Sequence, residues 1–292
     1  MIKYEGDIYR PPSEAYSLLI QLTIGCSWNK CAFCGMYREE QFRVRSLEEI
    51  KADLLEARRM YRRVRRIFLC DGDALCLSTD KLCTILDMIK EILPECERVG
   101  IYASSKDILA KTHEELVELR KRNLGIAYIG AESGNPEVLK YINKGVTREE
   151  IIQSVHMVED AGIKASVTFL AGIGGKAHMK EHAVDTGTMI TEMNASYASV
   201  LTIIPVPTSD LFEDVRAGRF QVLSPEEAVM ETHIMIENMN PTRECIFRAN
   251  HASNYVNLRG VLPQDKEKML AQLEWAMDHK ASSFKPERYR GL

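Results

Sequence analysis

The stretch Gln21-Leu-Thr-Ile-Gly-Cys-Ser-Trp-Asn-Lys-Cys-Ala-Phe-Cys-Gly-Met-Tyr37 begins in an apolar, strand-like run and carries three cysteines within nine residues. Four residues separate Cys26 from Cys31, and two separate Cys31 from Cys34. Cysteines can pack as small apolar side chains, but a loop that also contains glycine, serine and asparagine is a poor place for such packing. The spacing therefore predicts a metal site made of thiolates.

The number of thiolates favours one kind of metal site. A structural zinc site takes four protein ligands, usually as two close pairs, and the first histidine of the chain is only reached at His113. An iron–sulfur cluster normally has four thiolate ligands, so three would leave one iron open for chemistry. A zinc-binding interaction module and an iron–sulfur electron carrier or assembly scaffold remain as alternatives, although an electron carrier would favour a fourth cysteine in the loop.

This loop resembles the cluster loop of the radical S-adenosylmethionine (SAM) superfamily, where an aromatic residue precedes the last cysteine, as Phe33 does here. The usual spacing in that family is three then two, so the longer first gap departs from the commonest pattern. The resemblance implies a [4Fe–4S] cluster held by Cys26, Cys31 and Cys34, with the amino and carboxylate groups of SAM on the fourth iron. It also implies that an electron cleaves SAM to methionine and a 5′-deoxyadenosyl radical, which abstracts hydrogen from a substrate. Phe33 and Tyr37 are candidate cofactor-binding residues.

Outside the loop, strand-like apolar runs alternate with amphipathic helical runs. This alternation predicts an α/β fold with a parallel sheet and outer helices, and the resemblance implies a partial (β/α)6 TIM-like barrel. We expect an N-terminal arm over residues 1–16, a core over 17–207 and a C-terminal extension over 208–292 that completes the barrel mouth with a strand and helices. The expected strands are Ser17–Ile24, Arg66–Cys70, Arg98–Ala103, Leu124–Ile129, Ile163–Leu170, Ala198–Ile204 and Glu244–Arg248. The expected helices are 47–61, Thr79–Ile92, His113–Lys121, Pro136–Ile142, Arg148–Ala161, Met179–Met193, Pro225–Asn238 and Gln264–His279.

Parallel barrels carry their chemistry on the loops after the carboxyl ends of the strands, and unusual residues occur at these places. Asp71-Gly72-Asp73 follows the second strand and resembles the Gly-Gly-Glu-like segment of the family. Gly72 would let the backbone approach the amino group of SAM closely, and Asp73 would supply the negative charge. An ordinary turn is the alternative. Ser104, after the third strand, is a candidate ribose contact.

The segment Glu132-Ser133-Gly, after the fourth strand, resembles the branch that contains oxygen-independent coproporphyrinogen oxidases, methylthiotransferases and the elongator catalytic subunit. By that resemblance Glu132 reaches the ribose or the amino acid end of SAM, and Ser133 joins the candidate cofactor-binding residues. Capping of the helix near Pro136 is the alternative for Glu132. The glycine-rich turn from Gly172 would flank the adenine; it follows the fifth strand, whereas a dinucleotide fingerprint follows the first.

The polar segment Arg-Ala-Asn-His-Ala-Ser-Asn-Tyr, residues 248–255, follows the last expected strand and offers donors and acceptors for a polar substrate. We predict that Asn250, His251 and Asn254 act as catalytic residues and line the barrel mouth on the side of SAM away from the cluster. A surface turn is the alternative. His178 and His182 would share one helix face, which is expected to be exposed.

Composition excludes some classes of function. Lysine and arginine number 38 against 42 aspartates and glutamates, for a net charge of −4, which argues against binding nucleic acid through bulk positive charge. The arginine-rich stretch 58–66 is expected to be a solvated helix end. No apolar run reaches the length of a membrane span, and no signal-peptide core opens the chain. The remaining thiols, at Cys70, Cys76, Cys83, Cys96 and Cys245, are expected to be structural rather than part of a second motif.

Together these inferences predict a radical SAM enzyme, of oxidoreductase, transferase or lyase type, acting on a small polar substrate in the cytoplasm at low oxygen. The small substrate is favoured because no acetyltransferase, RNA-binding or cobalamin-binding module follows the core. The expected partner is a reductant such as flavodoxin or ferredoxin, with neither a membrane nor nucleic acid expected. Modification of RNA or protein and a non-enzymatic iron–sulfur electron carrier remain as alternatives.

Overall fold

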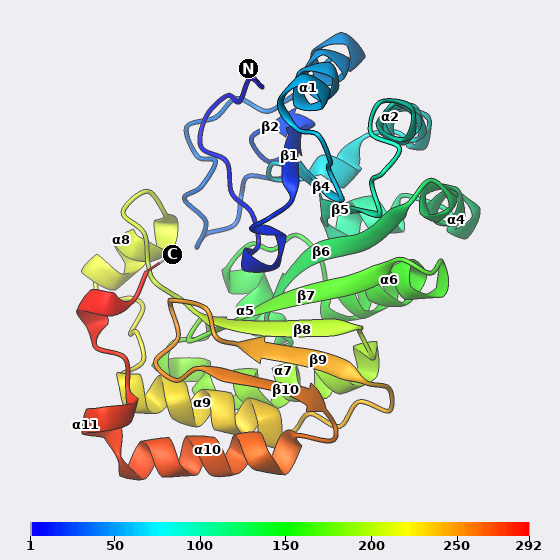
Figure 1. Cartoon of the computed structure of the whole chain (residues 1–292). Coiled ribbons are helices and arrows are strands. Elements are labelled where there is room, and N and C mark those ends of the chain that lie inside the picture. Colours follow the sequence, from blue (N-terminus) through cyan, green and yellow to red (C-terminus); the bar gives the residue numbers. More distant parts are fainter. Residues whose placement is uncertain (1, 292) are drawn as a thin grey trace. The chain divides into compact units, whose positions relative to one another are not determined.

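The computed structural model describes residues 2–291, which form two compact units, and each unit is described by itself. Unit 1 contains the residues up to Asn29, Met36–Ile129 and Met157–Ala165. Unit 2 contains Lys30–Gly35, Gly130–His156 and the residues from Ser166 onward. The main sheet has eight strands, of which the first four along the chain lie mainly in unit 1 and the last four mainly in unit 2 (Figure 1).

Parallel strands form the sheet of unit 1. Leu18 lies opposite Ile67, and Arg66 opposite Arg98, so each strand runs in the direction of its neighbour. Parallel neighbours need a crossover connection, and helices supply it on one side of these strands (Figure 1). In order across the sheet, the strands are β1 (Leu18–Gln21), β4 (Arg66–Cys70), β5 (Arg98–Ala103) and β6 (Leu124–Glu132). The helices are α1 (Leu47–Met60), α2 (Thr79–Ile92), α3 (Ser105–Leu109) and α4 (His113–Lys121), with short 3-10 turns at Pro12–Glu14 and Ala74–Cys76.

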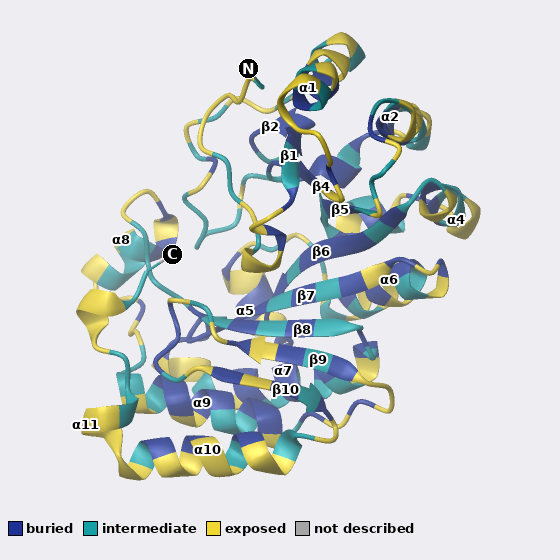
Figure 2. Ribbon diagram, viewed as in Figure 1, coloured by how far each residue is buried: buried dark blue, intermediate teal, exposed yellow. Residues whose placement is uncertain are grey.

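Local sequence signals account for the positions of these helices. Ser46 begins α1 with a capping box, in which its hydroxyl accepts from the Glu49 N–H and the Glu49 carboxylate accepts from the Ser46 N–H. The same box, made by Thr112 and Glu115, begins α4. Apolar residues at helical spacing then face the sheet and are buried, while the outer faces stay exposed (Figure 2). The predicted bounds of β4, β5, α2 and α4 are confirmed.

The first expected strand, Ser17–Ile24, is wrong as a single element. The chain leaves the main sheet at Leu22, and β2 (Thr23–Ile24) pairs antiparallel with β3 (Arg43–Val44). The backbone hydrogen bonds explain the break: the N–H of Leu22 still donates to Cys70, at 3.3 Å, but its carbonyl accepts from the Arg45 N–H, at 2.9 Å. The antiparallel pair of β2 and β3 therefore lies at the start of the cysteine loop.

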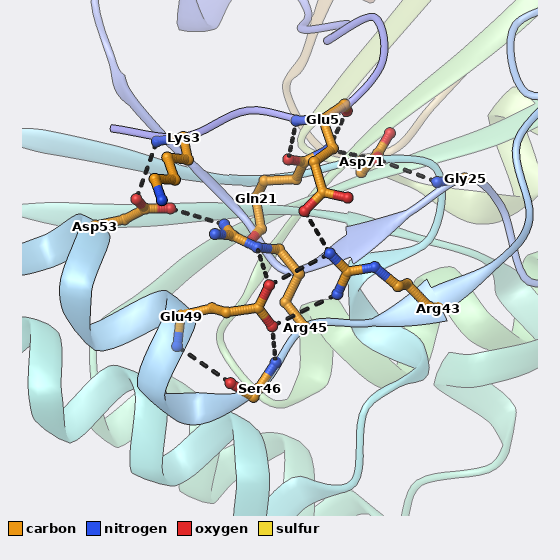
Figure 3. Close-up of polar contacts among 10 residues, drawn as sticks. All are labelled: Lys3, Glu5, Gln21, Gly25, Arg43, Arg45, Ser46, Glu49, Asp53 and Asp71. Atoms are coloured by element: carbon orange, nitrogen blue, oxygen red, sulfur yellow. Dashed lines mark hydrogen bonds and ion pairs between the residues drawn. The ribbon is translucent and has the colours of Figure 1, made fainter. Parts of the chain in front are cut away.

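Residues near the N-terminus are bonded to the rest of unit 1. The N–H of Lys3 donates to the Asp53 carboxylate at 3.1 Å, and the N–H of Glu5 donates to the side chain of Gln21 at 3.0 Å (Figure 3). Asp53 also forms a buried ion pair with Arg45, at 2.7 Å. The start of the chain is therefore attached to β1 and α1 through side chains of both.

Unit 2 ends in an antiparallel pair. Strands β8 (Tyr197–Thr202) and β9 (Cys245–Ala249) run parallel, with Tyr197 opposite Ile246, whereas β10 (Leu258–Leu262) runs antiparallel to β9, with Leu258 opposite Ala249. The sequence analysis assigned no strand to β10. The strands are β7 (Lys164–Ala171), β8 (Tyr197–Thr202), β9 (Cys245–Ala249) and β10 (Leu258–Leu262). The helices are α5 (Pro136–Tyr141), α7 (Met179–Met193), α8 (Asp210–Arg216), α9 (Pro225–Glu237), α10 (Lys266–Asp278) and α11 (Lys280–Ser283), with α6 (Arg148–Asp160) shared by both units and 3-10 turns at Lys176–His178 and Glu287–Tyr289.

Two further outcomes concern the sheet and the membrane. The fourth expected strand, Leu124–Ile129, continues in β6 as far as Glu132, so Glu132 ends a strand instead of lying in the loop after it. In residues 2–291, no helix has both the length and the apolar character needed to cross a membrane.

Candidate functional site

In unit 1, the end of β4 holds the start of the cysteine loop. One carboxylate oxygen of Asp71 accepts from the Gly25 N–H at 3.1 Å and from the side-chain amide of Gln21 at 3.0 Å (Figure 3). Asp71 has a φ of 84° and Gly25 one of 75°, both in the left-handed region. Burial raises the pKa of Asp71, while hydrogen bonds from Gln21 and Tyr37 act against this. A non-glycine residue in this conformation at the mouth of a sheet is typical of a functional site.

Gly72 lies against the first cysteine of the loop. A Cβ atom placed on Gly72 would come within 2.7 Å of the Cβ of Cys26 and 2.9 Å of the Gly25 carbonyl oxygen. No side chain fits at this position, so the glycine is required for the close approach of the two backbones.

Asp73 is a buried carboxyl group with an unused oxygen. Its side chain is 2% exposed, and Oδ2 accepts from the hydroxyl of Ser27. Oδ1 has no hydrogen-bond partner among the residues that the structure describes. Burial and the neighbouring carboxyl group of Asp107 raise the pKa of Asp73 to about 8. A buried carboxyl group with a spare acceptor suits a positively charged ligand.

Ser104 begins α3 as its cap. Its hydroxyl accepts from the Asp107 N–H at 3.2 Å and donates to the Asp107 carboxylate. The predicted ribose contact therefore already has partners within α3. The sequence analysis missed Asp107, although a serine followed three residues later by an acidic residue is a signal for a helix start.

In unit 2, the second half of the cysteine loop is attached to α5 and α8. The N–H of Ala32 donates to the carbonyl of Ile142, and the N–H of Leu211 donates to the carbonyl of Ala32, both at 2.8 Å. Cys31, Phe33 and Cys34 are each partly exposed. The segment therefore presents its thiols at the surface of unit 2 while its backbone is fixed.

The donor set fits an iron–sulfur cluster. Cys26 is also partly exposed, and a thiol that is neither deeply buried nor remote from solvent can be deprotonated by a metal. Within residues 2–291, no three His, Cys, Asp or Glu side chains are grouped as metal ligands. Cys26 belongs to unit 1, and Cys31 and Cys34 belong to unit 2. The ligand set stays a prediction.

The other cysteines have the character of structural thiols. Cys70 and Cys245 are buried. Burial raises the pKa of Cys76 to about 12 and that of Cys96 to about 11. Thiols with such pKa values are poor thiolate donors.

Glu132 is held by an ion pair and not by the following helix. Its carboxylate accepts from the Lys144 ammonium at 3.0 Å, and its φ is 68°. Asn135 caps α5 through its side chain, which accepts from the Val138 N–H at 3.0 Å. The alternative that Glu132 caps this helix is therefore wrong. Lys144, the ion-pair partner of Glu132, was given no role in the sequence analysis.

Ser133 and His182 form a buried pair, so the prediction that His182 is exposed is wrong. The Nε2 of His182 lies 3.1 Å from the Leu170 carbonyl, so it carries the proton and donates. Nδ1 then accepts from the Ser133 hydroxyl at 2.8 Å. Burial lowers the pKa of His182 to about 4, so the ring is neutral at physiological pH. The predicted cofactor contact at Ser133 is fully buried and packs inside unit 2.

Gly172 follows β7 with a φ of 82°, and its N–H donates to the carboxylate of Glu231 on α9. Glu231 is fully buried, and its other oxygen has no partner among the described residues. Burial raises the pKa of Glu231 to about 8. The sequence analysis missed this residue because nothing local marks a buried glutamate in an ordinary helix.

The three predicted substrate residues differ in burial and in hydrogen-bond partners. Asn254 is buried; its side-chain carbonyl accepts from the Thr202 hydroxyl at 2.9 Å, and its amide donates to Val200 at 2.8 Å. Its polar atoms therefore hold the loop to β8, which corrects the prediction that they face a substrate. His251 is half-buried and accepts from the Ser253 N–H at 3.2 Å, while Asn250 is exposed.

Comparison with known families and proteins adds to this geometry. Residues 20–185, more than half of the 292, match a family model described as the radical SAM superfamily. A protein of Methanocaldococcus jannaschii named for a methylthiotransferase activity is 22% identical over 216 residues, covering 70% of this chain and 46% of that protein. A tRNA-2-methylthio-N(6)-dimethylallyladenosine synthase of Bdellovibrio bacteriovorus is 23% identical over 218 residues, covering 73% of this chain and 46% of that protein. The chain thus spans about half the length of the curated relatives that it matches.

Solved structures share the fold. Coproporphyrinogen III oxidase from Escherichia coli superposes with a TM-score of 0.58 at 16% identity, over 94% of this chain and 61% of that chain. Elp3 of Methanocaldococcus infernus superposes with a TM-score of 0.52 at 14% identity, over 91% of this chain and 64% of that chain. The predicted fold class, an α/β partial barrel of TIM type, is confirmed.

Proposed function

We propose a function from the premise that this chain belongs to the radical SAM superfamily, whose members are enzymes that use a [4Fe–4S] cluster and SAM. The predicted family, enzyme class and cofactors are thereby confirmed. The ligands, the substrate, the reductant, the cytoplasmic location and the low-oxygen setting stay predictions.

The proposed activity is reductive cleavage of SAM, followed by removal of hydrogen from a small polar substrate. Cys26, Cys31 and Cys34 would hold the cluster, which when bound would supply the electron for the reductive cleavage of SAM. The chain's own residues bind and orient. Asp73 binds the amino group of SAM, and Glu132 binds the ribose or the amino acid end.

The unused Oδ1 of Asp73 is the observation that carries this proposal. The carboxyl group is buried, it accepts a hydrogen bond from Ser27, which is the residue after Cys26, and the adjacent Gly72 lies against Cys26. A cationic ligand at this place would therefore lie next to the cysteine loop. An amino group of SAM whose lone pair lies on the open iron keeps two N–H donors, and the spare oxygen can accept one of them.

The choice of a small substrate rests partly on the arginine-rich stretch. Arg58 pairs with Glu95 at 2.9 Å, and Arg65 pairs with Glu97 at 2.7 Å, so acidic partners neutralise part of this stretch. Modification of tRNA is the second candidate, because one of the relatives is named for that activity. Since the chain covers only 46% of that relative, its substrate does not transfer directly.

An anaerobic reconstitution tests the proposal. The reconstituted protein should contain about four iron atoms per chain, and with dithionite and SAM it should form 5′-deoxyadenosine. Cys26→Ala should lose the iron, whereas Cys245→Ala, at a buried thiol, should keep it. Zinc without iron, or a loaded protein that never forms 5′-deoxyadenosine, would contradict the proposal.

The same protein separates the two candidate substrates. Transfer RNA and a small-metabolite extract are each added to the reduced, SAM-containing protein, and 5′-deoxyadenosine is measured. A stimulation by the small-metabolite fraction alone supports the small substrate, and one by tRNA alone supports the second candidate.

A further inference from the structure

We propose that Asp107 is a second carboxylate of the site that binds the amino group of SAM, so that this amino group is held between Asp107 and Asp73. This inference deepens the proposed function and rests on it. No motif of the cysteine loop or of the segment after β4 includes Asp107, which lies on α3.

The two carboxyl groups come from separate elements but lie beside each other. Asp73 follows β4, and Asp107 belongs to the first turn of α3, which follows β5. The Asp107 carboxyl group is near enough to Asp73 to raise the pKa of that side chain. The neighbouring strands pair in parallel, with Ile67 opposite Val99, so their carboxyl ends meet at one edge of the sheet.

Ser104 fixes the side chain of Asp107 in this place. Its hydroxyl bonds both to the N–H and to the carboxylate of Asp107. On the opposite side, Ser27 fixes Asp73. Both carboxyl groups are therefore oriented before any ligand binds, which lowers the entropy cost of binding.

Within residues 2–291, neither carboxylate has a lysine or arginine as an ion-pair partner. The two lysines nearest in sequence to Asp107 have other contacts. Lys106 lies over the ring of Trp28, at 3.9 Å from its centroid, and Lys111 donates to the carbonyl of Leu77 at 2.9 Å. Two adjacent carboxylates repel each other unless a proton or a cation lies between them, so the pair is built to receive positive charge.

An amino group with two N–H donors can bind to both members of this pair. Oδ1 of Asp73 is buried without a partner, and Asp107 is partly exposed. A ligand that enters past Asp107 can donate one N–H to each carboxylate. The expected consequence is a preference for ligands that carry the amino group, in which Asp107 takes part.

Two ligands that differ in the amino acid part test this preference. S-adenosylhomocysteine carries the amino group, and 5′-deoxy-5′-methylthioadenosine keeps the adenosine and the sulfur but lacks the amino acid. Dissociation constants are measured by calorimetry on the anaerobically reconstituted protein. Asp107→Asn should weaken S-adenosylhomocysteine about tenfold, as expected for a charge-assisted hydrogen bond, and should leave methylthioadenosine unchanged.

Two variants serve as controls. Asp80→Asn removes one exposed carboxylate in the first turn of α2 and should change neither constant. Asp107→Glu keeps the charge and should restore part of the preference. If Asp107→Asn does not load iron, the dissociation constants of Asp107→Glu are compared with those of the wild type instead. The constant for S-adenosylhomocysteine should then change, and the constant for methylthioadenosine should not.

The outcomes are separable. An equal loss for both ligands would mean that Asp107 only supports α3, and an unchanged S-adenosylhomocysteine constant would mean that it does not touch the ligand; either result overturns the inference and leaves the proposed function standing. A wild-type protein that does not prefer S-adenosylhomocysteine over methylthioadenosine overturns both the inference and the role of Asp73.

Discussion

The buried carboxyl group of Glu231 makes a sharp prediction about stability and pH. Glu231→Gln keeps an oxygen that can accept from the Gly172 N–H but removes the group that titrates. Burial raises the pKa of Glu231 from its ordinary value of 4.5 to about 8 in the folded chain. The proton is therefore bound more tightly in the folded state than in the unfolded state.

The sign and size of the effect follow from this difference. Between the unfolded and the folded pKa, the folded state holds one proton that the unfolded state has released, so the free energy of unfolding falls as pH rises by about 1.4 kcal/mol per pH unit. The contribution of protonated Glu231 to the free energy of unfolding is fully present below pH 4.5 and falls as the pH rises toward 8. The glutamine variant lacks this loss, so its stability relative to the wild type should grow by roughly 2 kcal/mol between pH 6 and pH 8.

Urea unfolding followed by circular dichroism at pH 6, 7 and 8 measures the difference. Glu226→Gln is the matched control, because Glu226 is exposed on the same helix and its lowered pKa places its titration below this window. Curves of variant and wild type that run parallel from pH 6 to pH 8 would refute the reasoning, as would a variant that loses stability faster than the wild type.

Three further predictions concern packing near the site. Gly72→Ala should reduce the iron bound per chain on reconstitution, because its Cβ would clash with Cys26; normal iron content would contradict this. Asn254→Ala should lower the free energy of unfolding by about 1–3 kcal/mol, because two buried hydrogen bonds are lost; an unchanged urea midpoint would contradict it. Asp53→Ala should cost about 3 kcal/mol, since it removes the nearer ion-pair partner of the buried Arg45 and leaves the carboxylate of Glu49 at 3.8 Å; the urea midpoint again measures this, and a loss below about 1 kcal/mol would contradict it.

Many element bounds could be predicted from the sequence because their causes are local. Periodic apolar residues and a capping signal lie within one turn of the helix that they begin, as at Ser46 and Thr112. The bounds of α7, Met179–Met193, are likewise confirmed. Strand β10 was missed because it is short and is defined by pairing with β9 rather than by a pattern of its own. The break at Leu22 was missed for the same reason, since the partner of its carbonyl is Arg45.

The sequence by itself determined the family, the cofactor class and most of the strand order, because cysteine spacing and hydrophobic period are properties of neighbouring residues. Only the tertiary structure decided which polar side chains are buried and which residues they contact. Asp73 meets Asp107, Ser133 meets His182, and Gly172 meets Glu231, each across separate elements. Burial and partnership set the pKa of a side chain and the ligand that it can accept, and both depend on residues that are distant in the sequence and adjacent only in the folded chain.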